Sequence, residues 1–165
     1  MLSKVLKAIA ELPVKAGLRM LPICSFLIWK KKKKFKLGVD YDGVITEKPE
    51  LFAFLTKATI RNGGEVHIIT GRRITPKFLK KLKEYGISYT HTFSIIDYHK
   101  AIGSEFRVEP HKQYKIELLK DDRLYDSTKG EYCRKNGISL HIDDSQCFIE
   151  YFSTPFALFV SKKPK

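Results

Sequence analysis

From residue 35 onward, short apolar segments alternate with longer segments of helical periodicity. Those with the length and the β-branched and aromatic content of buried strands are residues 35–40, 65–70, 87–96, 138–144 and 156–160. Residues 49–64 have apolar side chains at helical spacing, residues 75–86 follow as a helix, and residues 111–122 and 128–137 also look helical. Strands that alternate with helices favour a parallel sheet covered by helices on both faces. We therefore predict an α/β domain, a three-layer Rossmann-like fold with a mostly parallel central sheet.

Residues that begin and end helices support this division. Pro76 suits the first turn of the helix over residues 75–86, and Gly86 suits its end. Gly63 and Gly64 suit the end of the helix over residues 49–64. In the segment 49–64 the helical spacing comes from Leu51, Phe54, Leu55 and Ala58. Two connections are less regular: residues 123–127 are expected to form a short strand or turn, and residues 97–110 a small flap or hairpin.

Polar side chains collect where three of the predicted strands end. They are Asp40 and Asp42, Thr70 and Gly71, and Asp143 and Asp144, with Lys129 at the start of the helix before the last strand. Ligands of a parallel sheet bind at the carboxyl ends of its strands, so these side chains are expected to converge. Four carboxylates in one cleft repel one another unless a cation is present. Oxygen ligands of this kind favour Mg²⁺, which we predict as the cofactor.

Four short segments resemble, in chain order, the signature motifs of the haloacid dehalogenase (HAD) superfamily of phosphohydrolases. They are "DYDGVIT", "IITGR", "KGEYCRKNG" and "HIDDS". The resemblance extends over about residues 35–160, which is nearly all of the predicted domain. It implies a HAD-like fold, Mg²⁺ and an aspartyl-phosphate intermediate.

The resemblance also implies roles for individual residues. Asp40 matches the nucleophile, which also gives an oxygen to the metal. Asp42 matches the general acid and base, and its backbone carbonyl would bind the metal. Thr70 and Lys129 would hold the transferring phosphoryl group, and Gly43 would allow a tight turn next to it.

The remaining site residues follow from the same motifs. Asp143 and Asp144 match the metal-anchoring acids, although Asp144 has the alternative of supporting the site without touching the metal. Gly71 and Arg72 would contact the substrate phosphate, and a solvated surface arginine is the alternative for Arg72. Thr70, taken alone, could equally cap the following helix. The phosphate-binding lysine has rivals between the second and fourth motifs: Lys100, Lys112, Lys115 and Lys120.

Response-regulator receiver domains also cluster acids, a Thr and a Lys around Mg²⁺. In those proteins the acidic pair comes early in the chain, and the phosphorylated Asp, the Thr and the Lys follow. Here the order is Asp-x-Asp, Thr, Lys and Asp-Asp. The order of the motifs therefore argues against a receiver domain.

The spacing of the motifs limits any cap over the site. Residues 43–69 hold one helix and one strand, and residues 71–128 allow a helix, a strand and another helix, so we expect little or no cap. An open cleft fits a macromolecular phosphate, a lipid headgroup, or a small substrate that a second subunit encloses. We predict a Mg²⁺-dependent phosphomonoester hydrolase whose substrate is a nucleotide or another small phosphate ester. A polynucleotide-end phosphatase, a phospholipid-headgroup phosphatase and a non-catalytic membrane or interaction module are the alternatives.

The basic character of the chain is concentrated at its start. The net charge is +13, and residues 1–36 hold ten Lys and Arg side chains against a single Glu. We treat residues 1–34 as a basic, amphipathic arm and residues 35–165 as the phosphatase domain. The arm either lies on an anionic membrane surface or packs on the domain or another subunit, and a nucleic-acid contact is less favoured. Its apolar run is too short to cross a bilayer.

Cysteine usage bears on the compartment. The three cysteines, Cys24, Cys133 and Cys147, are odd in number and lack metal-ligand spacing. This pattern favours reduced thiols and a cytoplasmic protein, one that could associate peripherally with a membrane.

Overall fold

A computed structural model describes residues 33–111 and 114–161. The chain divides into two units, Met1–Lys32 and Lys33–Lys165. The predicted arm therefore lies outside the described residues except for Lys33 and Lys34. Within the part that is described, no helix is long and apolar enough to cross a membrane.

The domain is built on a sheet of five strands with the order β3-β2-β1-β6-β7. The strands are β1 (Lys36–Val39), β2 (Glu65–Thr70), β3 (His91–Ser94), β6 (Leu140–Asp143) and β7 (Phe156–Leu158). Every neighbouring pair in this sheet is parallel. The predicted α/β fold with a mostly parallel central sheet is confirmed, and it has the arrangement of a Rossmann-like domain.

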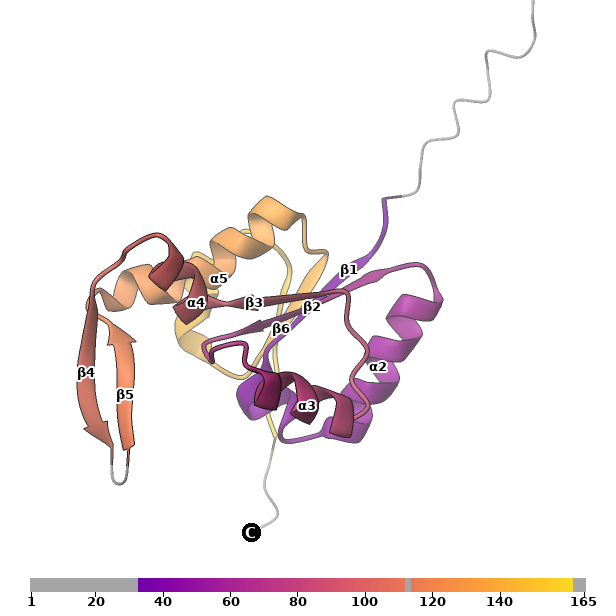
Figure 1. Ribbon diagram of the computed structural model, residues 1–165. Coiled ribbons are helices and arrows are strands. Elements are labelled where there is room, and N and C mark those ends of the chain that lie inside the picture. Colours follow the sequence, from indigo (N-terminus) through magenta and orange to yellow (C-terminus); the bar gives the residue numbers. More distant parts are fainter. Residues whose placement is uncertain (1–32, 112–113, 162–165) are drawn as a thin grey trace, which may run out of the picture. The chain divides into compact units, whose positions relative to one another are not determined.

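Helices cover both faces of the sheet. Figure 1 shows α2 (Pro49–Arg61) and α3 (Pro76–Glu84) on one side, and α5 (Asp122–Asn136) on the other. Phe52 of α2 and Leu82 of α3 belong to a buried cluster with the β1 and β2 side chains on their face, whereas Cys133 of α5 packs with Ile69 on the opposite face. The core is therefore divided into two apolar layers by the sheet.

The ends of these helices follow the expected chemistry. Pro76 opens α3, and the Thr75 side chain accepts a hydrogen bond from the backbone N–H of Phe78. Gly137 follows α5 at φ 63°, a left-handed conformation that favours glycine. α2 differs from the expected pattern: it buries Phe52 and Thr56, while Leu51 and Phe54 are exposed.

The prediction of a helix over residues 111–122 is wrong. This region contains β5 (Tyr114–Leu119), which pairs antiparallel with β4 (Phe106–His111) in a separate two-stranded sheet. The physical reason is visible in "YKIEL", where apolar and charged residues alternate with the period of a strand. The hairpin expected within residues 97–110 therefore exists, but it lies further along the chain and projects beyond the main sheet (Figure 1).

Two further boundaries are corrected. The strand expected over residues 87–96 is limited to β3, because Ser94 caps α4 (Ile95–Ala101) by accepting a hydrogen bond from the Asp97 N–H. Residues 123–127 are helical, neither strand nor turn, because α5 begins at Asp122 with Asp121 as its cap.

Candidate active site

The predicted site residues lie at the carboxyl edge of the sheet, where the strand order reverses. The chain runs outward from β1 to β2 and β3 and then returns to place β6 on the other side of β1. Asp40 follows β1, Thr70 ends β2 and Asp143 ends β6. Such a switch point is where open α/β sheets bind ligands.

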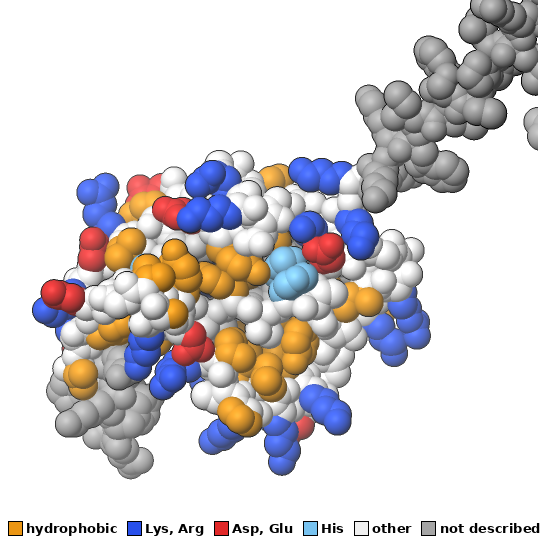
Figure 2. Space-filling view, turned by 45° about the horizontal axis from the view of Figure 1, so that its top comes forward, with side chains coloured by type: hydrophobic (Ala, Val, Ile, Leu, Met, Phe, Trp, Pro, Cys, Tyr) orange, Lys and Arg blue, Asp and Glu red, His pale blue; other side chains and the backbone are white. Residues whose placement is uncertain are grey.

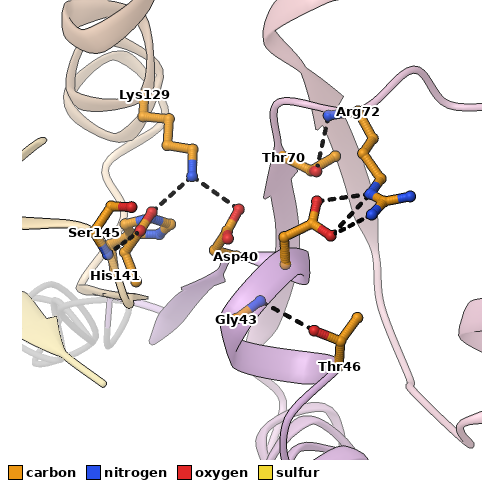
Figure 3. A network of polar contacts seen from close by, with 10 residues as sticks. Asp40, Gly43, Thr46, Thr70, Arg72, Lys129, His141 and Ser145 are labelled. Atoms are coloured by element: carbon orange, nitrogen blue, oxygen red, sulfur yellow. Dashed lines mark hydrogen bonds and ion pairs between the residues drawn. The ribbon is translucent and has the colours of Figure 1, made fainter. Parts of the chain in front are cut away.

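Lys129 is the centre of the site. Its ammonium donates to Asp40 Oδ1 at 2.8 Å and to Asp143 Oδ2 at 2.7 Å (Figure 3). Its side chain is only 3% exposed, and the Nζ atom lies 4.4 Å from the ring centroid of Phe148. Burial alone would lower the pKa of Lys129, but the charges of Asp40 and Asp143 raise it above its ordinary value. The lysine is therefore a buried, charged bridge between α5, Asp40 after β1 and Asp143 at the end of β6.

Asp143 is held by several donors. His141, two residues earlier on β6, donates from Nε2 to Oδ2 at 3.2 Å, and the backbone N–H of Ser145 donates to Oδ1 at 3.0 Å. Burial raises the pKa of Asp143, but the bond from His141 and the Lys129 charge outweigh burial and hold that pKa below its ordinary value. Asp143 is an ionised, fixed carboxylate.

Asp40 is the opposite case. Burial, with the nearby charge of Asp143, raises the pKa of Asp40 to about 7 even though Lys129 opposes the shift. Burial and the Asp143 charge likewise raise the pKa of Asp144. The single ammonium of Lys129 is thus too little positive charge to keep the pKa values of all these carboxyl groups at or below their ordinary values.

The three acids form a group that suits a divalent cation. One carboxylate oxygen from each of Asp40, Asp143 and Asp144 lies within 4.8 Å of the others. Three ionised carboxylates and one ammonium leave two negative charges, which a divalent ion would balance. Mg²⁺ prefers such oxygen ligands, so the donor set fits it. We call Asp40, Asp143 and Asp144 the carboxylate cluster.

Gly43 lies against the cluster. Its φ of 69° is left-handed, and a Cβ at this position would collide with the Asp144 carboxylate. Its N–H donates to Thr46 Oγ1 at 3.0 Å, which closes the turn Tyr41–Ile45 (η2) after β1. The turn therefore brings backbone without a side chain against the carboxylate of Asp144.

Asp42 is placed apart from the other acids. Both of its carboxylate oxygens accept from Arg72, with Nε at 2.7 Å from Oδ2 and at 2.9 Å from Oδ1 (Figure 3). The two side chains are 46% and 61% exposed, so they line the entrance. The side chain of Asp42 is not in the carboxylate cluster, and the expected role of its backbone carbonyl in metal binding stays a prediction.

Thr70 and Gly71 complete the edge. Thr70 is fully buried, and its Oγ1 accepts a hydrogen bond from the backbone N–H of Arg72 at 3.0 Å. Gly71 leaves room for the Tyr125 hydroxyl, which a Cβ would strike. A cavity of about 380 Å³ lies at this edge, and its lining includes Asp40, Asp42, Gly43, Gly71, Arg72, Lys129 and Asp144. Thr70 and Asp143 are buried and do not line it.

The structure also identifies site residues that the sequence prediction missed. His141 orients Asp143, and Tyr125, Phe148 and Ser145 line the cavity. His141 could have been found, because residues two apart on a strand share a face. Leu118 of the hairpin also lines the cavity, so β5 forms part of its wall.

Comparisons with known proteins add no family to this description. No protein-family model matches the chain, and neither the curated proteins nor the solved structures contain a match.

Proposed function

We propose that this protein is a Mg²⁺-dependent phosphomonoester hydrolase that acts through an aspartyl-phosphate on Asp40. The observation that carries the proposal is the buried Lys129 bridging two carboxylates of a three-carboxylate cluster at the sheet's switch point. The ordered motifs that resemble the HAD superfamily support the same chemistry.

The ion's binding site would be the carboxylate cluster. When bound, Mg²⁺ supplies positive charge that offsets the carboxylates and the phosphate oxygens. Asp143, ionised and fixed by His141 and Ser145, suits a permanent ligand. Asp40, with its pKa raised to about 7, is freed to react when positive charge next to it favours the ionised form.

The reaction has two steps. An Asp40 oxygen attacks phosphorus, and the bond to the leaving oxygen breaks as that oxygen takes a proton from Asp42. Water, deprotonated by Asp42, then attacks the aspartyl-phosphate and releases inorganic phosphate and the free Asp40 carboxylate. For the first step Asp42 must be protonated and leave its ion pair with Arg72.

Lys129 and Thr70 serve the phosphoryl group. The Lys129 ammonium holds Asp40 Oδ1 at 2.8 Å and would share its charge with the transferring oxygens. Thr70 ends β2 and is followed by Gly71, which lines the cavity. Its buried hydroxyl remains the expected donor to a phosphoryl oxygen, although Thr70 itself does not line the cavity. Arg72 would bind the phosphate at the entrance.

A second cavity bears on the substrate. It has a volume of about 670 Å³, shares Arg72 with the first, and is lined by basic side chains of Arg73, Lys77, Lys80 and Lys81. Anionic groups of a substrate beyond its scissile phosphate would pair with these basic side chains. This favours a nucleotide as the substrate. A polynucleotide end satisfies the same cavity, and a steep loss of its binding with salt would support that alternative.

The test is hydrolysis of nucleoside monophosphates and a generic phosphomonoester with and without Mg²⁺. We expect Mg²⁺-dependent release of phosphate that falls at least about 1,000-fold in Asp40→Asn, as for loss of a nucleophile. Asp122→Asn, an exposed acid paired with Arg107, is the matched control and should keep full activity. Activity that survives Asp40→Asn would refute the mechanism. A folded protein that binds no Mg²⁺ and hydrolyses none of these substrates, phosphorylated oligonucleotides or phosphatidate vesicles would leave the non-catalytic alternative.

A further inference from the structure

A second group of ligand-type side chains lies toward the opposite, amino-terminal end of the same strands. Glu65 and His67 are two residues apart on β2 and therefore share a face. His91 begins β3 and is the register partner of His67. We call Glu65, His67 and His91 the histidine cluster.

The cluster is compact. One ligand atom of each member lies within 4.8 Å of the others. The two imidazole rings stack at 4.3 Å between centroids and 13° between planes. On the face in Figure 2, histidine surface lies beside acidic and basic side chains, next to apolar surface. The cluster is thus reached from solvent through His91, which is exposed, while His67 is 1% exposed.

His67 has a nitrogen without a hydrogen-bond partner among the described residues. Its Nε2 is buried, and Glu65 Oε2 lies 3.6 Å away, beyond hydrogen-bond range. Its other nitrogen, Nδ1, lies 2.9 Å from the Tyr132 hydroxyl. If Nδ1–H donates to Tyr132, then Nε2 carries a lone pair aimed at the cluster. Buried polar atoms usually have partners, so this one requires an explanation.

We propose that the histidine cluster binds a transition-metal ion, with Zn²⁺ the best match. Two imidazole nitrogens and a carboxylate oxygen form a three-ligand zinc set that leaves one position for water or another ligand. A histidine ligand whose second nitrogen is fixed by a hydrogen bond is the usual arrangement, and Tyr132 supplies that bond. Mixed nitrogen and oxygen donors distinguish this site from the all-oxygen carboxylate cluster.

Lys36 would compete with a bound ion for the carboxylate of Glu65. Its ammonium lies 3.0 Å from Glu65 Oε2, and that of the more exposed Lys34 lies 3.9 Å from Oε1. An ion that takes Glu65 must weaken these pairs. Removing the Lys36 charge should therefore tighten metal binding, an effect opposite to that of removing a ligand.

The site also touches the helix of the candidate active site. Tyr132 follows Lys129 by three residues on α5, so the two side chains lie on neighbouring positions of one helix. An ion at the histidine cluster would fix β2 to β3 and, through Tyr132, would contact α5.

The test is titration of the full chain with Zn²⁺ in the presence of excess Mg²⁺, followed by calorimetry. Excess Mg²⁺ competes with Zn²⁺ for the all-oxygen carboxylate cluster. One bound Zn²⁺ that is also retained in Asp40→Asn therefore reports the histidine cluster. Co²⁺ in place of Zn²⁺ should give the intense visible bands of a four-coordinate ion with nitrogen ligands. These readouts do not depend on phosphatase activity, so the proposal stands or fails separately from the proposed function.

Variants assign the ion to its ligands. His91→Gln, at an exposed position, and Glu65→Gln should each weaken Zn²⁺ binding at least about 100-fold, since loss of a supporting residue alone gives about 10- to 100-fold. Tyr132→Phe should weaken it about 10-fold or more. Tyr98→Phe, whose ring also packs on Phe93, is the control.

A substitution that tightens Zn²⁺ binding completes the assignment of the ion to the histidine cluster. Lys36→Gln should tighten Zn²⁺ binding by up to about fivefold, the worth of one surface ion pair. Zn²⁺ affinity that is unchanged by His91→Gln and Glu65→Gln would overturn the proposal. Binding that is lost in Asp40→Asn and kept in His91→Gln would also overturn it, because the ion would then lie in the carboxylate cluster.

Discussion

The carboxylate cluster and the histidine cluster occupy opposite ends of one sheet, and they differ in how their buried polar groups are stabilised. In the carboxylate cluster, two buried carboxylates share one buried ammonium, that of Lys129. In the histidine cluster, the buried group is a neutral ring, and the charges of Glu65 and Lys36 lie nearer to solvent. Burial of an unpaired charge is far more costly than burial of an unpaired neutral nitrogen.

The two clusters therefore depend on neighbouring charges to different extents. The carboxylate cluster needs Lys129 or a bound cation for the fold to tolerate it. The histidine cluster is expected to tolerate the loss of its surface charges, because its ion pairs lie nearer to solvent. Substitutions at the carboxyl end of the sheet are therefore expected to change the free energy of unfolding most. Substitutions at the amino end are expected to change mainly the affinity for a ligand.

The largest expected effect is that of Lys129→Met. Without the ammonium, Asp40 and Asp143 are buried beside each other, and removal of one partner from a buried ion pair destabilises by about 3–5 kcal/mol. Lys36→Met, at the other end of the sheet, should lower the free energy of unfolding by less than about 1 kcal/mol. Urea unfolding with a chelator present measures both variants.

Added Mg²⁺ sharpens the test of Lys129. A divalent ion in the carboxylate cluster would replace part of the lost charge, so Mg²⁺ should restore more stability to Lys129→Met than it adds to the unaltered protein. Equal losses in Lys129→Met and Lys36→Met would contradict the comparison between the two ends.

Gly43→Ala is expected to rank second. The substitution combines a left-handed φ of 69° with a collision against Asp144, for a loss of about 1–3 kcal/mol together with weaker Mg²⁺ binding. Gly103→Ala is the matched control, since its φ is 76° and a Cβ there meets nothing within 4 Å. Differential scanning calorimetry compares the two. If Gly103→Ala is equally damaging, backbone strain explains the loss and the contact with Asp144 does not.

Much of the fold could be predicted, because strand ends carry strong local signals. Residues 65–70 match β2, and Pro76 opens α3 as expected. The wrong helix over residues 111–122 arose because a short segment of alternating residues also contains apolar residues at helical spacing. Only its pairing with β4 decides between the two, and pairing partners are not encoded locally.

The two clusters also differ in how far the sequence could predict them. The structure brings Asp40, Lys129 and Asp143 together, as the places of Asp40 and Asp143 at strand ends suggested. Lys129 was expected at the start of a helix over residues 128–137, but α5 begins at Asp122, so Lys129 lies in the middle of that helix. Glu65 and His67 lack any motif with His91, because they meet it only through the register of β2 with β3. Asp42 was expected beside Asp40, but its pairing with Arg72 depends on the turn after β1, which the spacing did not specify.

The pH dependence of stability should separate the two ends. In a chelator, Asp40 has an ordinary pKa of 3.8 when unfolded and about 7 when folded, so between these values the folded state holds an extra proton. Its contribution to stability therefore falls as pH rises through this window. For His67, burial and the nearby His91 lower the pKa from 6.5 to about 4, so the unfolded state holds the extra proton and stability rises with pH.

Two variants isolate these opposite slopes. Relative to the unaltered protein, Asp40→Asn should make the free energy of unfolding change with pH by up to about +1.4 kcal/mol per unit between pH 5 and 6, and His67→Gln by up to about −1.4. Urea midpoints at several pH values give both slopes. If the slope changed with the same sign in both variants, the opposite pKa shifts of Asp40 and His67 would be contradicted.

The smallest expected change in stability is that of Arg72→Gln. The Asp42–Arg72 pair is bidentate, but both side chains are about half exposed, so its loss should alter the free energy of unfolding by less than about 1 kcal/mol. Its effect on the proposed reaction should be larger, with a higher KM, because Arg72 borders both cavities. Arg72→Lys keeps the charge without the planar fork, so it should recover little if bidentate geometry matters. Full recovery of KM by lysine would show that charge alone is required, and an unchanged KM in Arg72→Gln would remove Arg72 from the entrance of the site.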